Sequence, residues 1–237
     1  MSQPRTRTPK LGLVASADET GTPAPHQGPY ARSFDRRRQE ILATTWEMIA
    51  EHGGEEFNLT ELSKRSGVAL RTIYNAFQDR DGLIAQAVAT HYHSLFGGIE
   101  ILSNESHTLE EAIEMCARVA TETARVKAFS ATAARMYFAA RTNPRLVDTL
   151  RRLPLFILKA WLRSDEVDPK LVSRFGRERL ERSFANTQWG AVNDWAAGRL
   201  DDHDLAREMK SSILQIAMAF GNRAGRAAAK RLCRDYD

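Results

Sequence analysis

Features that mark secreted and membrane proteins are missing from these 237 residues. Cys116 and Cys233 are too few for a disulfide framework and too far apart in sequence for a metal site. No apolar run reaches the length of about 18 residues that a membrane helix requires, so we expect no membrane partner. The amino terminus lacks the apolar core of a signal peptide. We therefore expect a cytoplasmic protein.

Sequence motifs of catalysis are missing as well. There is no HExxH, P-loop, GxGxxG or CxxC motif. His91 and His93 are two residues apart, so they face apart on a helix and cannot share a metal ion. No serine has a histidine and an acid at a recognisable spacing. Because catalysis needs a constellation of groups, we predict no catalytic residues, no metal ligands, no cofactor and no enzymatic activity.

Alternating strand patterns and internal repeats are also absent, and the segments beyond residue 105 have helical periodicity, so the sequence predicts an all-α fold.

Five of the eight prolines fall within residues 1–33, with almost no large apolar side chains, which predicts a disordered tail. The net charge of +4 is a weak guide to nucleic-acid binding. Between Pro29 and Ser94, eight Lys and Arg residues face nine Asp and Glu residues.

The stretch from Asn58 to Phe77 predicts two short helices joined by a tight turn. Asn58 and Glu61 are three residues apart and fit a capping box at the start of the first helix. Gly67 supplies the left-handed residue that ends this helix. The second helix would bury Val68, Ile73 and Phe77. Such a pair is the helix-turn-helix arrangement, which places its second helix in the major groove of DNA.

Polar side chains on the outward face of the second helix suit DNA recognition. Arg71 and Asn75 lie four residues apart on one side of the helix, and they can pair with guanine and adenine respectively. The hydroxyls of Thr72 and Tyr74 can bond phosphate oxygens, and Leu70 lies near the same face. An ordinary helical hairpin with solvated polar residues fits this pattern too.

The surrounding residues resemble the amino-terminal domain of the TetR family of bacterial transcriptional regulators. The resemblance is carried by residues 38–42, Gly53, the hairpin and residues 74–83, about 50 contiguous residues in all. Two positions depart from the family pattern. Ala69 opens the second helix where a small hydroxylated residue is usual, and Arg80 replaces the usual lysine. Arg80 keeps the charge and can still contact the DNA backbone.

The resemblance implies three segments. Residues 1–33 form the tail, residues 34–80 a three-helix helix-turn-helix DNA-binding domain, and residues 81–237 a larger helical domain for effector binding and dimerisation. Helices are expected at residues 35–52, at 81–96 up to an interruption at Gly97 and Gly98, and at 108–126, 128–141, 145–162, 169–199 and 203–234. Thr108 and Glu111 form a second capping box.

The middle helices carry more large apolar and aromatic side chains than packing alone requires. The predicted effector pocket comprises Met115, Val119, Phe129, Met136, Tyr137, Phe156 and Trp161. We expect a mainly apolar small-molecule effector, with Tyr137 or Trp161 offering one directed hydrogen bond. Core packing explains any single one of these residues equally well.

The resemblance also implies that the last two helices pair with those of a second copy in a homodimer. The predicted interface comprises Phe184, Ala191, Val192, Trp195, Ile213, Ile216, Ala217 and Phe220. Gly190 and Gly221 would let backbones approach closely. The same side chains could instead fill the core of the body itself.

These features together predict a ligand-responsive transcriptional regulator that acts as a repressor. It would bind double-stranded DNA at a two-fold related operator and leave it when a small effector binds. Two alternatives stay open: a small-molecule binding protein whose hairpin is incidental, and an all-α enzyme that uses the pocket.

Overall fold

The computed structural model describes residues 29–52, 56–101 and 105–234, and it places twelve helices in them. Most of the expected tail lies outside this part of the chain. The helices are α1 Pro29–His52, α2 Leu59–Ser66, α3 Leu70–Phe77, α4 Arg80–Ile101, α5 Leu109–Arg125, α6 Lys127–Phe138, α7 Pro144–Arg152, α8 Leu155–Trp161, α9 Pro169–Phe175, α10 Arg177–Ala196, α11 Asp202–Phe220 and α12 Arg223–Arg234. Within the described ranges the only strand pairing is an isolated bridge between Val167 and Gly221. The all-α prediction is confirmed.

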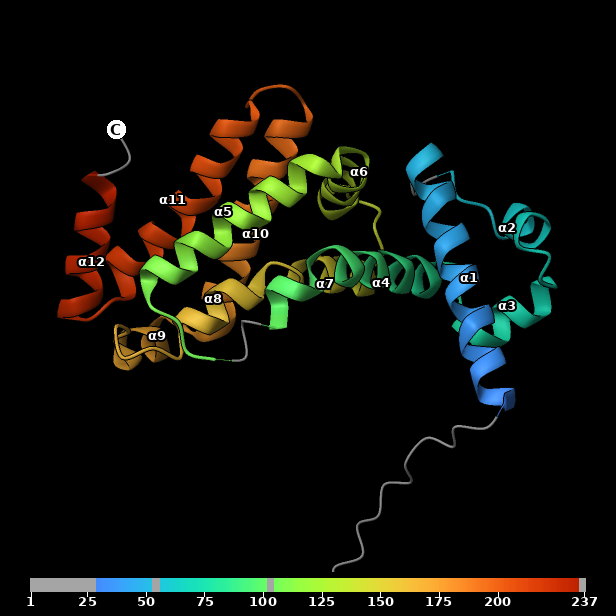
Figure 1. Cartoon of the computed structure of the whole chain (residues 1–237), viewed down its shortest axis with the longest axis horizontal. Helices are drawn as coiled ribbons and strands as arrows, with labels where there is room; N and C mark the ends of the chain where they lie inside the picture. Colours follow the sequence, from blue (N-terminus) through green and yellow to red (C-terminus); the bar gives the residue numbers. More distant parts are fainter. Residues whose placement is uncertain (1–28, 53–55, 102–104, 235–237) are drawn as a thin grey trace, which may run out of the picture.

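A small head is formed by α1, α2, α3 and the start of α4 (Figure 1). Ile49, Leu62, Ile73 and Phe77 are almost fully buried and form its core, as their helical spacing predicts. The first helix begins at Pro29 rather than at Asp35, so its first turn lies in the segment expected as tail.

The helix α4 connects this head to the remaining helices, which form the body (Figure 1). The expected interruption at Gly97 and Gly98 is wrong, because α4 runs through both glycines to Ile101. A glycine weakens a helix interior by only about 1 kcal/mol relative to alanine. The buried side chain of Phe96 anchors this last part of the helix.

The body is built around α11, which packs against both α5 and α10, and these two helices in turn pack against α6 and α8. Its first helix begins with the predicted capping box: Thr108 Oγ1 accepts from the Glu111 amide, and the Glu111 carboxylate accepts from the Thr108 amide. This confirms the helix start read from the sequence. No described helix combines the length and apolarity needed to cross a bilayer.

Three helices expected as continuous are each divided in two. Pro154, which has no amide hydrogen to donate, separates α7 from α8. Gly176 adopts a φ of 96° and separates α9 from α10. Gly221 separates α11 from α12, and a side chain there would meet Ala217 O at 2.5 Å. This close approach lies within one chain, so it explains Gly221 without a second copy.

Candidate nucleic-acid interface and ligand cavity

The turn between α2 and α3 sets the position of the reading helix. Asn58 caps α2 by accepting from the Thr60 amide at 2.7 Å. The predicted reciprocal bond from Glu61 does not form, because Glu61 pairs with Lys64 and Arg65 instead. Gly67 has a φ of 65° and ends α2 in the left-handed conformation, as predicted.

The outward face of α3 carries four exposed polar side chains, those of Arg71, Thr72, Tyr74 and Asn75. None of the four makes a hydrogen bond or ion pair with any other described residue. Leu70 is half-buried and packs against the core of the head. Four polar groups without partners on one helix face are free to bind an external ligand.

Arg80 lies behind the reading helix, where its guanidinium is engaged within the chain. Its Nε donates to Phe57 O at 3.0 Å, and its Nη1 pairs with Asp81 at 3.0 Å. Its guanidinium carbon also lies 5.8 Å from the ring centroid of Phe57. A phosphate contact by Arg80 therefore remains a prediction. In the structure its bond to Phe57 connects the start of α4 to the segment that precedes α2.

Two features that fix the angle of α3 were not foreseen. Gln78 has a φ of 68° and forms a γ-turn in which the Asp79 amide donates to Phe77 O at 2.8 Å. Arg38 of α1 donates to Ala76 O at 3.1 Å, and its guanidinium lies 4.6 Å from the Phe77 ring centroid. Arg38 lies three residues before the buried Ile41, on the same face of α1. This spacing is the sequence signal that could have predicted its inward position.

A mainly apolar cavity lies in the body near its junction with the head. Its lining comprises Tyr92, Phe96, Val119, Thr123, Phe129, Ser130, Pro154, Gln188, Trp189, Val192 and Met209. The space between atoms is about 350 Å³, and the centre of a water molecule can occupy about 30 Å³ of it. In this conformation the cavity has room for no more than about two water molecules, so a larger ligand must displace its walls.

Of the predicted pocket residues, Val119 and Phe129 line this cavity. Met115, Met136, Tyr137, Phe156 and Trp161 are buried but are not part of its lining. The two predicted hydrogen-bonding side chains have partners elsewhere: Tyr137 Oη donates to Asn186 at 2.5 Å, and Trp161 Nε1 donates to Glu166 at 3.3 Å.

An aromatic stack joins the cavity wall to the head. The ring centroid of Phe129 lies 4.5 Å from that of Trp46 in α1 and 4.9 Å from that of His91 in α4. Trp46 and His91 are themselves stacked at 4.7 Å. Burial lowers the pKa of His91, so its imidazole is neutral at neutral pH. One side chain of the cavity therefore touches two helices that carry the head.

A polar groove of about 780 Å³ separates the head from α6 and α7. Asn143 Nδ2 crosses it and donates to Asp81 at 3.0 Å, and Arg145 lies 3.8 Å from Asp79. These contacts connect the start of α7 with the start of α4. The head side of the groove contributes charged groups of both signs, Glu56, Arg80 and Asp81, whereas the side of α6 and α7 contributes the basic Arg135 and Arg141.

The residues predicted for a dimer interface pack inside the single chain. Phe184, Ala191, Val192, Trp195, Ile213, Ile216 and Ala217 are buried, and Phe220 is half-buried against Phe175. They therefore form no exposed apolar stripe on α10 or α11. Gly190 differs, since a side chain there would meet nothing within 4 Å.

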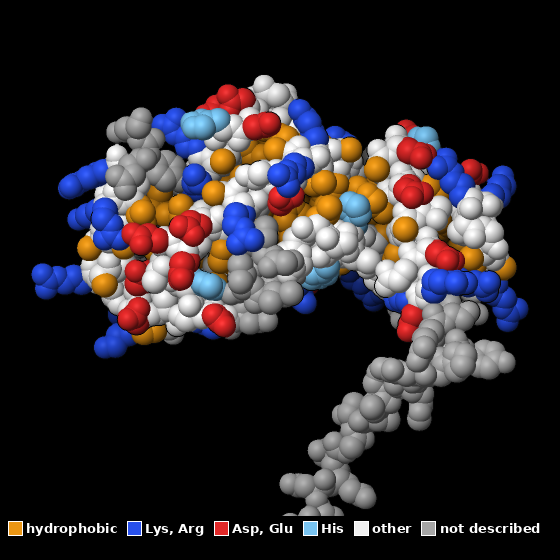
Figure 2. All heavy atoms as spheres, in the orientation of Figure 1, with side chains coloured by type: hydrophobic (Ala, Val, Ile, Leu, Met, Phe, Trp, Pro, Cys, Tyr) orange, Lys and Arg blue, Asp and Glu red, His pale blue; other side chains and the backbone are white. Residues whose placement is uncertain are grey.

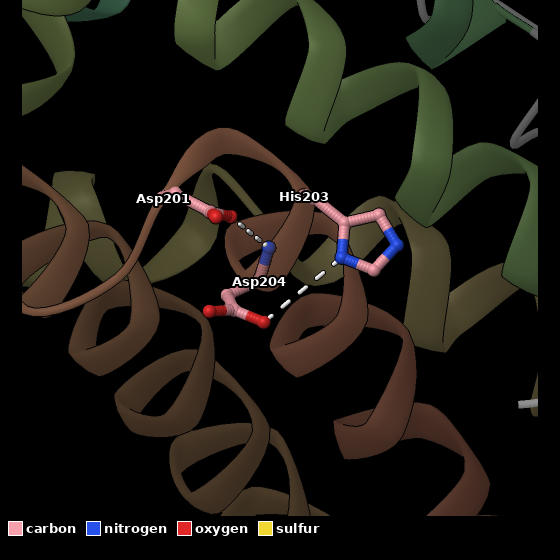
Figure 3. Close-up of side chains that lie close together, drawn as sticks. All are labelled: Asp201, His203 and Asp204. Atoms are coloured by element: carbon pink, nitrogen blue, oxygen red, sulfur yellow. Dashed lines mark hydrogen bonds and ion pairs between the residues drawn. The ribbon is translucent and has the colours of Figure 1, made fainter. Parts of the chain in front are cut away.

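Asp201, His203 and Asp204 bring three possible metal ligands within 4.8 Å of one another (Figure 3). The arrangement is explained by the start of α11, where Asp201 caps the helix by accepting from the Asp204 amide at 2.8 Å. Asp201 and His203 are exposed. Nothing further at this helix end indicates a bound ion.

The sequence pattern that describes "Bacterial regulatory proteins, tetR family" matches residues 41–87. The match spans the second half of α1, the whole of α2 and α3, and the first turns of α4, and it therefore includes the exposed polar face of α3. Residues 41–87 therefore form the DNA-binding domain of the TetR family of bacterial transcriptional regulators.

Solved structures of TetR regulators share the fold over about three quarters or more of the chain. One from Rhodococcus sp. RHA1 is 17% identical, with a TM-score of 0.55 over 76% of this chain and 95% of that one. One from Streptomyces coelicolor is 15% identical, with a TM-score of 0.55 over 85% and 90%. Thermus thermophilus FadR, a repressor in complex with lauroyl-CoA, is 23% identical, with a TM-score of 0.50 over 74% and 91%. No protein of curated function matches the chain.

The TetR assignment agrees with the charge on the surface of the head. In Figure 2, basic side chains lie along the lower and right-hand edges of the head. Arg36 and Arg37 at the exposed side of α1 and Lys64 in α2 belong to the basic groups of this domain. Local clusters of this kind attract phosphates although the domain as a whole is close to neutral.

Proposed function

We propose that this protein is a homodimeric TetR-family repressor that binds a two-fold related operator and releases it when a mainly apolar small molecule enters the body cavity. The observation that carries the proposal is the face of α3, where Arg71, Thr72, Tyr74 and Asn75 are exposed without partners. Nothing in the described part of the chain supports an enzymatic reaction, and a DNA-binding domain is not needed by a small-molecule carrier.

The DNA-binding step follows from the position of α3. Arg71 and Asn75 project one helical turn apart and are the candidates for base contacts. Thr72 and Tyr74 flank them and can donate hydroxyl hydrogens to phosphate oxygens. Leu70 packs partly against the head and would hold the start of α3 against it rather than read a base.

The effector step follows from the cavity and the aromatic stack. A ligand that enters the cavity must move its walls, and Phe129 is the wall residue that touches Trp46 and His91. Displacing Phe129 therefore shifts α1 and α4 relative to the body. The ligand releases DNA if it binds better to the conformation in which the two heads no longer match the operator spacing.

A gel-shift titration of the full chain with the DNA upstream of its own gene tests the function. We expect a specific complex whose affinity falls steeply with salt concentration, because each neutralised phosphate releases counterions. A control DNA of the same length and scrambled sequence should bind only weakly. Equal binding to both DNAs at every salt concentration would contradict a sequence-specific regulator.

Gly190 provides a separate prediction on dimerisation. Glycine inside a helix costs about 1 kcal/mol relative to alanine, and the single chain has no steric need for it at Gly190. We therefore propose that the partner's α10 approaches closely at this point. Replacing Gly190 with leucine should shift the protein from dimer to monomer in sedimentation velocity.

The matched control for this variant is Gly97→Leu. Gly97 also lies inside a helix with nothing within 4 Å of a side chain, but it lies on α4. Gly97→Leu should remain dimeric. If Gly190→Leu sediments as a dimer at the same concentrations as the unchanged protein, the interface does not include this part of α10.

A further inference from the structure

Gln188 is the one residue of the cavity wall with a buried polar atom that has no hydrogen-bond partner among the described residues. It lies on α10, lines the cavity and is 2% exposed. Its Oε1 is sealed from solvent and has no hydrogen-bond partner among the described residues. A buried carbonyl without a donor costs about 1–3 kcal/mol, and such groups are rare in folded proteins.

The neighbours of Gln188 fix which way its amide points. Its Nε2 donates to Met209 O at 2.9 Å and to Ser212 Oγ at 2.7 Å. Met209 O can only accept, and the hydroxyl hydrogen of Ser212 is already donated to that same carbonyl at 2.8 Å. Exchanging the amide atoms would place Oε1 against Met209 O, which are both acceptors, and would remove the bond to that carbonyl. The nitrogen therefore faces α11, and the oxygen is the atom left without a partner.

Other polar side chains of the wall have their hydrogens engaged within the chain: Trp189 Nε1 donates to Leu150 O at 2.9 Å, and Ser130 Oγ donates to Thr123 O at 3.1 Å. The hydroxyl hydrogen of Ser130 is therefore used as well, and this hydroxyl can offer an incoming ligand only lone pairs. Burial raises the pKa of the neighbouring Cys116 thiol to about 12, so this group adds no negative charge at neutral pH. The wall thus combines an apolar surface with one buried acceptor, Gln188 Oε1, that has no donor among the described residues.

We propose that Gln188 selects the effector: the cavity takes a compact apolar molecule that carries one hydrogen-bond donor, a hydroxyl or an N–H, placed to donate to Oε1. A carboxylate at this point would meet Oε1 with a second acceptor and be rejected. The proposal deepens the effector role proposed above and rests on it. It adds a chemical requirement that apolar lining alone does not impose.

Benzyl alcohol and anisole test the requirement, because they are isomers with one ring and one oxygen, and only the alcohol carries an O–H group. The two are compared by calorimetric titration of the full chain, without DNA. Anisole is the more apolar of the two, so a purely hydrophobic cavity prefers it. We expect the reverse: benzyl alcohol should bind about tenfold more tightly, and benzoate should show no binding.

Gln188→Met removes Oε1 while keeping an unbranched side chain of similar length, and the preference should then turn to anisole. Ser212→Ala is the control, since it removes a partner of Nε2 and leaves Oε1 in place. It should keep the preference for the alcohol, and it preserves the test if Gln188→Met does not fold.

Anisole binding as tightly as the alcohol to the unchanged protein would overturn the proposal, as would an unchanged ratio of the two affinities in Gln188→Met or no binding of the alcohol. A buried water that satisfies Oε1 predicts the first of these results. The gel-shift experiment involves none of these compounds, so the proposed function can fail or succeed independently.

Discussion

Replacing Arg71 with alanine should lower operator affinity by about 1–3 kcal/mol for each half-site. A two-fold complex contains the change twice, so the total loss is expected to be at least roughly 30-fold in the dissociation constant. The reason is geometric: Arg71 is exposed on α3, has no partner among the described residues, and lies one turn from Asn75. Quantitative gel shifts on the operator and on single-base variants measure the effect.

The sharper version of this experiment uses Arg71→Lys, which keeps the positive charge but loses the two-pronged donor geometry. If Arg71 reads a base, lysine should preserve binding to non-specific DNA and relax the preference at one position in each half-site. A uniform loss for all DNA sequences in Arg71→Ala, with the base preference intact, would assign Arg71 to the phosphate backbone instead.

The head could be predicted in detail because its signals are local. Asn58, Gly67 and the apolar spacing of Ile73 and Phe77 each act over a few residues, and each lies where its local role requires. Glu61 failed as a capping partner because Lys64 and Arg65, one turn further on, compete for its carboxylate. The residues that fix the angle of α3 were missed, since Arg38 acts across 38 positions in the sequence.

The body was harder to predict because periodicity cannot tell a core from an interface. The stripe that includes Val192, Trp195 and Ile213 is apolar at helical spacing in either case. In the structure α10 and α11 pack against each other, and α10 also packs on α6 while α11 packs on α5, so the stripe is covered within one chain. The cavity was only partly predicted for the same reason. Phe129 and Met136 look alike in the sequence, yet only Phe129 belongs to the cavity lining.

Gln188 shows a further limit of sequence reasoning. A glutamine on a helix normally indicates a solvated face, since polar residues are mostly exposed. It is buried here because α10 lies inside the body, and its Nε2 is satisfied by the backbone of α11. Only the three-dimensional arrangement reveals that its second amide atom has no partner.

The second large effect is expected at Phe129, the residue shared by the cavity and the aromatic stack. Phe129→Ala should lower the free energy of unfolding by about 3–5 kcal/mol, because it removes a buried ring and leaves a cavity. It should also change operator affinity, by about 0.5–2 kcal/mol, although α6 is not part of the head. The ring that holds Trp46 and His91 would be missing, and the head would lose its fixed orientation on the body.

Phe156→Ala separates this coupling from simple destabilisation. Phe156 is 6% exposed and Phe129 is 4% exposed, but Phe156 lies on α8, which packs on α5, α7 and α10. Chemical denaturation should give a similar loss of stability for both variants. Gel shifts at low temperature, where both are folded, should give altered operator affinity for Phe129→Ala alone. An equal change in both variants would mean that operator affinity follows overall stability, and unchanged affinity in Phe129→Ala would mean that the stack does not set the orientation of the head.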